Sequence, residues 1–303
     1  MSRALKEFLE TVLPQDHILL EEPMSRHTTF GIGGPAECFV IVDTADQLER
    51  VFSYLQRAGW DFFLIGNGSN LLVGDKGYRG VVIRLGQGFE KIDVQGDRMT
   101  AGAGVLLGGA AKAALAAGLS GMEFASGIPG TIGGAVRMNA GAYGGEMSRI
   151  VETVEVMGLD GEILTLDNET MEFAYRSSVI KNRPYVVLSV TLRLTPGNEE
   201  EIAGKMRELT RRRREKQPLE YPSAGSAFKR PEGYFAGKLI MDAGLQGYSC
   251  GGAQISEKHC GFIINRGNAT AADVAQLIRK TITTVQDKFG VTLEPEVIFL
   301  GDF

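Results

Sequence analysis

The chain has 303 residues, more than a single ordinary core accommodates, so we expect two or three domains. Hydrophobic residues make up 44% and charged residues 23%, which is the composition of a soluble globular protein. The net charge of −5 argues against nucleic-acid or membrane-surface binding by the protein as a whole. We expect neither a membrane span nor a signal peptide, because no apolar run is long enough and the N-terminal stretch mixes in charges.

The cysteine content predicts reduced thiols in a cytoplasm. Cys38, Cys250 and Cys260 form an odd number without the spacing of metal ligands. Cys250, His259 and Cys260 could supply three ligands, but the sequence offers no fourth. We therefore expect no structural metal.

Residues 1–25 are predicted to form a helix followed by an acidic link, and Cys38–Val42 a buried strand. Thr44–Ala58 has the pattern of an amphipathic helix. Thr44 and Gln47 suggest a capping box at its start, and Gly59 should end it.

The turn after the next predicted strand is the first candidate cofactor site. Phe62–Ile65 should be that strand, completing a β-α-β unit, and it leads directly into the sequence GNGSN at 66–70. Open α/β sheets bind ligands at the carboxyl ends of their strands, and short polar side chains suit phosphate oxygens. An Asn-Gly pair is also the strongest hairpin signal, so a simple turn is the alternative interpretation.

The second candidate is Ser126–Gly145, in which seven of twenty residues are glycine. Without side chains, successive backbone N–H groups can line a concave site for a phosphorylated cofactor. Thr131 and Asn139 add side-chain donors, and Tyr143 adds a flat face. The alternative is a tight turn packed between two sheets, because glycine-rich runs are weak as motifs.

The elements between and after these segments are predicted from periodicity and turn signals. Within the run GAGVLLGGAAKAALAAGL, Gly102, Gly104 and Gly108 mimic a nucleotide fingerprint before a helix of Ala, Gly and Leu, but we favour tight packing on both sides of that helix. The remaining predicted elements are a strand at Val81–Leu85, hairpins at Ile92–Ala103 and Ile150–Leu166, strands at Tyr185–Leu194, Phe262–Asn265 and Leu293–Gly301, and helices at Glu199–Gln217 and Thr270–Phe289.

Several polar residues in the second half are candidates for chemistry. Arg176 precedes a strand and is either a surface charge or a fixed cation for a carboxylate. Ser226, followed by Lys229 and Lys238, suits an anionic substrate, but no histidine lies at the spacing of a hydrolase triad. Glu296 lies in an apolar run, which disfavours its ionised form, unless it faces outward from an alternating strand.

Six motifs in order resemble those of the UDP-N-acetylenolpyruvoylglucosamine reductase family of bacterial cell-wall precursor synthesis. They are HTTFGIGG, with His27 where Asn is usual, GNGSNLLV, GIPGTIGGAVRMNAGAYG, YRSS, QPLEYPSAGSAF and LEPEVIFLG. The resemblance covers nearly the whole chain. The chain has no room for the substrate-covering insertion of one subgroup, so it resembles the shorter, second type.

The resemblance implies an α+β fold: a two-lobed FAD-binding domain of the vanillyl-alcohol-oxidase-like (PCMH) type and a C-terminal α+β substrate domain. The implied boundaries are 1–25 for the N-terminal helix and link, 26–196 for the FAD domain with lobes near 26–90 and 91–196, and 197–303 for the substrate domain. NADPH would reduce FAD, leave, and be replaced in one shared pocket by the UDP-sugar enolpyruvyl substrate. Nucleic acid, a membrane and an obligatory protein partner are not expected.

The family's site residues fall on definite positions of this chain. The catalytic positions are Arg176, Ser226 and Glu296, and the basic residues Lys229 and Lys238 are candidates for substrate binding. Arg213 of the basic helix would also reach the FAD. The other positions expected to hold FAD are Gly66, Asn67, Gly68, Ser69, Asn70, Leu71, Pro129, Gly130, Thr131, Gly134, Asn139, Ala140, Gly141 and Tyr143.

Two other functions are alternatives to this one. A flavin oxidase of the same superfamily would keep FAD, often attached through His or Cys. A nucleic-acid binder would use the four arginines Arg211–Arg214, but a charge run is usually a solvated helix face and the net charge opposes this role.

Overall fold

A computed structural model describes residues 2–303 as a mixed helix and strand protein. The chain divides into two compact units. Unit 1 contains the residues up to Leu19, Phe39–Asn67 and Gly80–Arg212, and unit 2 contains Leu20–Cys38, Gly68–Arg79 and Arg213–Phe303. Each unit is therefore assembled from separate stretches of chain, whereas the boundaries expected from the sequence are contiguous.

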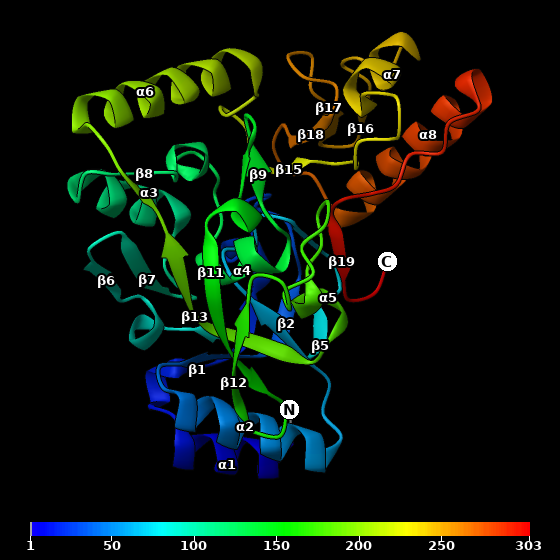
Figure 1. Ribbon diagram of the computed structural model, residues 1–303. Helices are drawn as coiled ribbons and strands as arrows, with labels where there is room; N and C mark the ends of the chain where they lie inside the picture. The colour runs from blue at the N-terminus through cyan, green and yellow to red at the C-terminus, as the bar shows by residue number, and fades with distance from the viewer. Residues whose placement is uncertain (1) are drawn as a thin grey trace. The chain divides into compact units, whose positions relative to one another are not determined.

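Unit 1 is built around a five-stranded antiparallel sheet in the order β12-β11-β13-β7-β6 (Figure 1). These strands are β6 (Ile92–Gln95), β7 (Arg98–Gly102), β11 (Val151–Gly158), β12 (Ile163–Asp167) and β13 (Tyr185–Arg193). The two predicted hairpins are confirmed as β6–β7 and β11–β12. Small pairs join β8 (Leu119–Ser120) to β14 (Thr195–Pro196), and β9 (Gly141–Ala142) to β10 (Gly145–Glu146).

A second sheet has four strands in the order β1-β2-β5-β3. They are β1 (Ile18–Pro23), β2 (Pro35–Val42), β3 (Phe62–Ile65) and β5 (Tyr78–Leu85), and β3 runs parallel to β5. The helices that begin in unit 1 are α1 (Arg3–Val12), α2 (Ala45–Ala58), α3 (Leu107–Ala116), α4 (Ile132–Arg137), α5 (Val179–Asn182) and α6 (Glu199–Lys216).

Helix α2 shows why local signals predicted its ends well. The Thr44 hydroxyl accepts a hydrogen bond from the Gln47 N–H at 3.2 Å, and Gly59 ends the helix at φ +68°. The Gln47 side chain accepts from the N–H of Asp43, so the reciprocal arm of the predicted capping box reaches one residue earlier. The predicted apolar face is buried, and burying each such side chain contributes about 1.5–3 kcal/mol; its residues are Leu48, Val51, Phe52 and Leu55.

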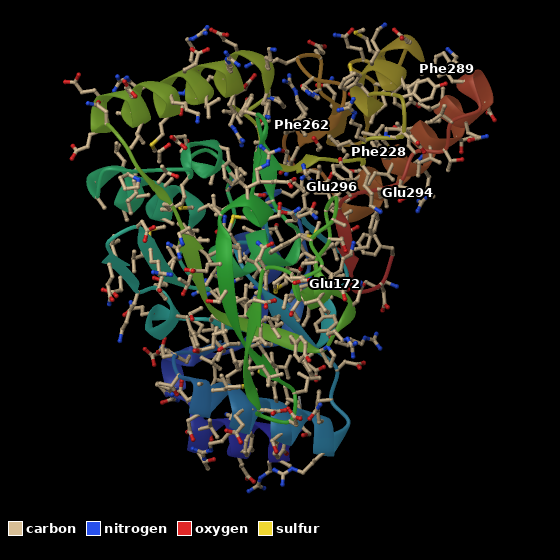
Figure 2. All side chains as sticks on the ribbon, viewed as in Figure 1. Glu172, Phe228, Phe262, Phe289, Glu294 and Glu296 are labelled. Atoms are coloured by element: carbon tan, nitrogen blue, oxygen red, sulfur yellow. The ribbon has the colours of Figure 1, made fainter. Side chains whose placement is uncertain are left out.

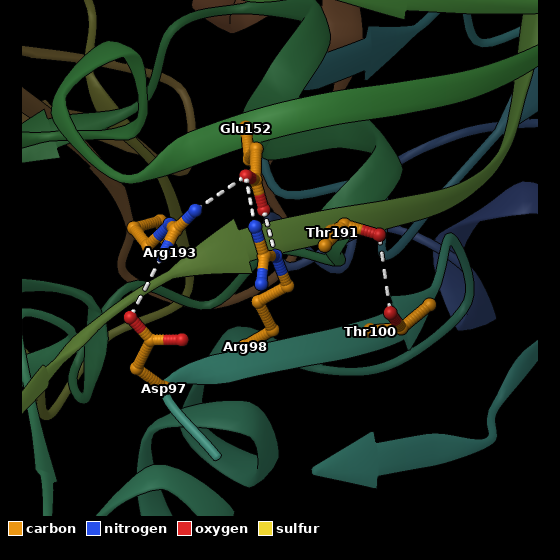
Figure 3. A network of polar contacts seen from close by, with 6 residues as sticks. All are labelled: Asp97, Arg98, Thr100, Glu152, Thr191 and Arg193. Atoms are coloured by element: carbon orange, nitrogen blue, oxygen red, sulfur yellow. Dashed lines mark hydrogen bonds and ion pairs between the residues drawn. The ribbon is translucent and has the colours of Figure 1, made fainter. Parts of the chain in front are cut away.

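One face of the five-stranded sheet carries a network of charges (Figure 3). Arg98 and Arg193 are paired across strands, where like charges repel. Glu152 accepts hydrogen bonds from both guanidinium groups, and Arg193 also donates to Asp97 at 2.8 Å. The hydrogen bond from Arg98, with that from Arg193, lowers the pKa of Glu152 to about 2.

Unit 2 is built around a four-stranded antiparallel sheet in the order β15-β18-β17-β16, with α8 beside it (Figure 1). The strands are β15 (Ser223–Ser226), β16 (Ser249–Cys250), β17 (Ala253–Ile255) and β18 (Phe262–Asn265), and the helices are α7 (Ala236–Asp242) and α8 (Ala271–Phe289). A separate parallel pair joins β4 (Leu71–Val73) to β19 (Ile298–Leu300).

Helix α8 begins with a full capping box between Thr270 and Asp273. The Asp75 carboxylate also accepts from the N–H groups of Ala271 and Ala272, at 2.7 and 2.9 Å, so the first turn is held from a distant loop. The inward face agrees with the predicted one. Its buried members include Val274, Leu277, Ile278 and Val285, with Ile282 partly buried.

Three sequence-based predictions are wrong in detail. Residues 18–23 form strand β1 instead of an acidic link, because pairing within a sheet overrides their acidic composition. Helix α3 is buried on one face only, since Gly109, Lys112 and Ala116 are exposed. The last strand is β19 alone, much shorter than Leu293–Gly301.

Candidate active site

Glycine-rich segment Ser126–Gly145 contains the short helix α4 and the pair β9–β10. Packing explains some of its glycines: a Cβ at Gly145 would lie 2.5 Å from the Phe124 ring, and one at Gly141 would lie 2.8 Å from the Gly145 carbonyl oxygen. Packing does not explain Gly134. It is exposed, and a Cβ there would meet only Thr131 Oγ1, at 3.4 Å. A glycine at an exposed position has no side chain in the way, so a ligand can approach its backbone closely.

The turn at 66–70 contacts this segment. The Asn67 side-chain amide donates to the Pro129 carbonyl at 2.8 Å. A Cβ at Gly66 would lie 2.7 Å from Thr131 Oγ1, so a larger residue there would require one of the two positions to shift. Gly66, Asn67 and Pro129 are all exposed. The structure thus brings together two of the predicted cofactor loops and leaves Gly66, Asn67, Pro129 and Gly134 exposed, which fits a phosphorylated cofactor such as FAD.

The hairpin interpretation of this turn is excluded. Strand β3 before it pairs with β5, and strand β4 after it pairs with β19. Gly68 is buried at φ +58°, and a Cβ there would lie 2.0 Å from the His27 carbonyl oxygen. Backbone contacts therefore fix the turn's shape, and they require glycine at this position.

Ser226 and Glu296 are brought close together in unit 2. Ser226 ends β15 with its side chain exposed, and the N–H of Glu296 donates to the carbonyl of Ala227 at 2.9 Å. Phe228 and Pro295 form a bridge next to them, and Figure 2 shows Phe228, Glu294 and Glu296 gathered there. Glu296 lies outside β19 and is half-buried, so neither the full apolar run nor the outward-facing strand position describes it.

Arg176 belongs to unit 1 and lies in a tight turn. Ala174 and Ser177 exchange backbone hydrogen bonds at 3.0 and 3.2 Å, and Arg176 itself has φ +54°. A left-handed conformation is strained for arginine, so surrounding contacts must hold it. The guanidinium carbon lies 5.1 Å from the centre of the Tyr175 ring. Its convergence with Ser226 and Glu296 stays a prediction.

The basic candidates are placed as follows. The Lys229 ammonium lies 2.7 Å from a Glu294 carboxylate oxygen. Lys238 is paired with Asp242 one turn along α7. In α6, Arg211 and Arg212 pair with Glu208 on the exposed face, while Arg213 is half-buried. The solvated-face interpretation therefore holds for Arg211 and Arg212. Contact of Arg213 with FAD, and of the two lysines with substrate, stays a prediction.

Two charged residues were not among the predicted site residues: Glu123, which is buried beside the glycine-rich segment, and Arg137, which is partly buried within it. Burial works to raise the pKa of Glu123, but hydrogen bonds, first from the Ser120 hydroxyl at 2.7 Å and also from the Gly121 N–H, outweigh it and lower that pKa. Arg137 donates to the Ile180 carbonyl at 2.9 Å, and burial lowers its pKa. A signal was present, because Arg137 is the sole charged residue in the glycine-rich segment.

Within residues 2–303, no group of three or more His, Cys, Asp or Glu side chains could hold a metal ion. None of the helices in the same range has the length and apolar character needed to cross a membrane.

Comparisons with known proteins match both parts of the chain. The family model described as "FAD binding domain" matches residues 36–167, and the model described as "UDP-N-acetylenolpyruvoylglucosamine reductase, C-terminal domain" matches residues 217–300. The UDP-N-acetylenolpyruvoylglucosamine reductase of Caldanaerobacter subterraneus subsp. tengcongensis is 51% identical over 302 residues, covering 100% of both chains.

Solved structures agree. The crystal structure of UDP-N-acetylenolpyruvylglucosamine reductase from Thermus caldophilus is 40% identical, with a TM-score of 0.81 over 94% of this chain and 98% of that one. A Phl p 4 variant described as a glucose oxidase is 12% identical, with a TM-score of 0.50 over 64% of this chain and 44% of its own, and so shares the fold alone. These similarities confirm the predicted α+β fold class, with an FAD-binding domain and a C-terminal domain.

Proposed function

The chain belongs to the UDP-N-acetylenolpyruvoylglucosamine reductase family, and from this premise we propose that NADPH drives its reaction and that the product, UDP-N-acetylmuramate, enters peptidoglycan synthesis. The protein is an FAD-dependent oxidoreductase acting on the enolpyruvyl ether of a UDP-sugar. We further propose a cytoplasmic location, which agrees with three free cysteines. Residues 26–196 are the proposed FAD domain and 197–303 the proposed substrate domain.

The observation that carries the proposal is that the backbone of Glu296 is hydrogen-bonded to Ala227, the residue next to Ser226. A hydroxyl and a carboxyl, far apart in the sequence, lie on neighbouring hydrogen-bonded segments. Proton delivery to a carbon atom and hydrogen bonding to a carboxylate require groups of these two kinds. The two loops joined by Asn67 and Pro129 support FAD binding in the same chain.

We propose that the 66–71 turn, through its exposed residues Gly66 and Asn67, and the glycine-rich segment hold FAD, with Arg213 of α6 adding a positive charge. When bound and reduced by NADPH, the flavin would supply a hydride for the terminal carbon of the enolpyruvyl group. The neighbouring carbon then carries negative charge that spreads into its carboxylate. Preorganised donors and cations stabilise such developing charge more effectively than water does.

The chain's own groups would handle this charge and the proton. Arg176 would stabilise the carboxylate as a fixed cation, and the carboxyl group of Glu296 would be the hydrogen-bonding group beside it. Ser226 would give its hydroxyl proton to the carbanion carbon, forming the new C–H bond. The exposed Ser226 oxygen would then regain a proton from water. Lys229 and Lys238 would interact with the anionic substrate.

The similarity to reductases over the whole chain favours this reaction over the flavin oxidase and the nucleic-acid binder. Visible absorption of the purified holoenzyme under anaerobic conditions tests it. The yellow flavin spectrum should bleach with NADPH and return when the enolpyruvyl UDP-sugar is added. A spectrum that NADPH leaves unchanged, or that stays bleached with substrate, would refute the proposal.

A further inference from the structure

Asn139, which is expected from the sequence to contact FAD, makes two hydrogen bonds with its side chain inside the protein. Its side chain is 3% exposed. The amide nitrogen donates to the Ala174 carbonyl at 3.2 Å, and the amide oxygen accepts from the Ser148 N–H at 2.9 Å. A side chain this buried, with both ends engaged, is a support for the backbone that it contacts.

The backbone that Asn139 supports carries Arg176. Ala174 is one end of the turn that includes Arg176, and the turn's other end, Ser177, is followed by the buried Ser178, whose hydroxyl donates to the Arg137 carbonyl at 3.0 Å. The Arg176 turn is therefore tied to the glycine-rich segment on both sides. These ties can hold the left-handed Arg176 backbone, a conformation that is strained for a residue other than glycine.

Asn70 has the same relation to Glu296. Its amide nitrogen donates to the Glu296 carbonyl at 3.0 Å. The Asn70 carbonyl accepts from the Ile298 N–H at 2.9 Å, and the Glu296 N–H donates to Ala227. Glu296 lies in irregular backbone between a bridge and a short strand, so these hydrogen bonds fix its place.

We propose that Asn70 and Asn139 are positioning residues for the proton and carboxylate chemistry, and that their side chains serve Glu296 and Arg176 instead of holding FAD. This inference rests on the proposed function, which makes Arg176 and Glu296 catalytic. Each FAD loop would then have two tasks: its backbone faces the cofactor, and its asparagine aligns one catalytic residue. A displacement of about 1 Å at such a residue can cost about 100-fold in rate.

The test replaces each asparagine by aspartate. Asn139→Asp and Asn70→Asp keep the size, the acceptor oxygen and the tolerance for a left-handed backbone, but lose the hydrogen donated to the carbonyl. Asn168→Asp is the control for loss of an amide donor, because Asn168, at an exposed position, also donates to two backbone carbonyls, of Ser148 and Val151, at 2.8 and 2.7 Å. For each holoenzyme, flavin content and the rates of flavin reduction by NADPH and of reoxidation by substrate are measured separately.

We expect Asn139→Asp and Asn70→Asp to keep their flavin and their reduction rate, while reoxidation by substrate slows roughly 10- to 100-fold relative to Asn168→Asp. Wild-type reoxidation in both variants, or loss of flavin together with both half-reactions, would overturn the positioning role. If an aspartate variant does not fold, Asn139→Gly or Asn70→Ala takes its place, with the same expectations for flavin content, reduction rate and reoxidation rate. Wild-type enzyme that substrate cannot reoxidise would instead refute the proposed function.

Discussion

Gly68→Ala tests whether the shape of the 66–70 turn is essential, and Gly59→Ala is its control. Both glycines have similar left-handed φ angles, +58° and +68°. An alanine Cβ at Gly59 would meet nothing within 4 Å, so this substitution costs only the left-handed strain, about 1–2 kcal/mol. At Gly68 the same strain applies, but the added Cβ would lie 2.0 Å from the His27 carbonyl oxygen.

The clash at Gly68 sets the size of the effect. Real Cβ atoms essentially never approach a neighbour closer than 3.0 Å, so the backbone at residue 68 and the His27 carbonyl must move apart by about 1 Å. Both sides of this contact are backbone, and no flexible side chain can absorb the shift. A displacement of about 1 Å beside a bound group can cost about 100-fold in function. We therefore expect Gly68→Ala to lose both stability and FAD affinity.

The assay is thermal unfolding of both variants together with FAD titration of the apoprotein. Gly59→Ala should unfold at a lower temperature than wild type but bind FAD normally. Gly68→Ala should unfold lower still and bind FAD at least about tenfold more weakly, which corresponds to 1.4 kcal/mol. Equal stability and equal FAD affinity in the two variants would refute the reasoning.

Three further predictions concern charged groups. Because the pKa of Glu123 is lowered in the folded state, the stability that its carboxylate contributes is present above the ordinary pKa of 4.5 and is lost as the pH falls below that value. Glu123→Gln should therefore lower the free energy of unfolding by about 1–3 kcal/mol at neutral pH and flatten the acid side of the Tm–pH curve. A curve with the wild-type shape would contradict this prediction. The stability that Glu152 contributes should likewise be lost as the pH falls from 4.5 to about 2, and 1 M salt should weaken it by screening. The check is thermal unfolding of Glu152→Gln and of the wild type at low salt and at 1 M salt. A difference in Tm that does not depend on salt would count against this prediction. Arg213→Ala should lower FAD affinity roughly tenfold while Arg212→Ala, at an exposed site paired with Glu208, leaves it unchanged, and equal effects in equilibrium titrations would disprove this.

Local signals predicted the elements that depend on neighbours in the sequence. The cap at Thr44, the αL glycine at Gly59 and the β6–β7 turn at Gly96 all act within a few residues, so their patterns can be read directly. Strand β1 could not be predicted in this way, because its residues are strand only through pairing with distant segments.

Part of the site also depends on long-range pairing. The resemblance supplied Ser226 and Glu296, but their proximity requires residues near 227 to pair with residues near 295. The role of Asn139 was predicted from its residue type as a ligand donor. A sequence does not reveal which partner a buried amide chooses, and here the partners are Ala174 and Ser148.

The most direct test of the central claim is rapid mixing of the Ser226→Ala holoenzyme under anaerobic conditions. We predict that NADPH bleaches its flavin at the wild-type rate, and that the enolpyruvyl UDP-sugar then fails to restore the colour because no group protonates the carbanion carbon. Recovery of the oxidised flavin spectrum at the wild-type rate would contradict the claim that Ser226 delivers this proton.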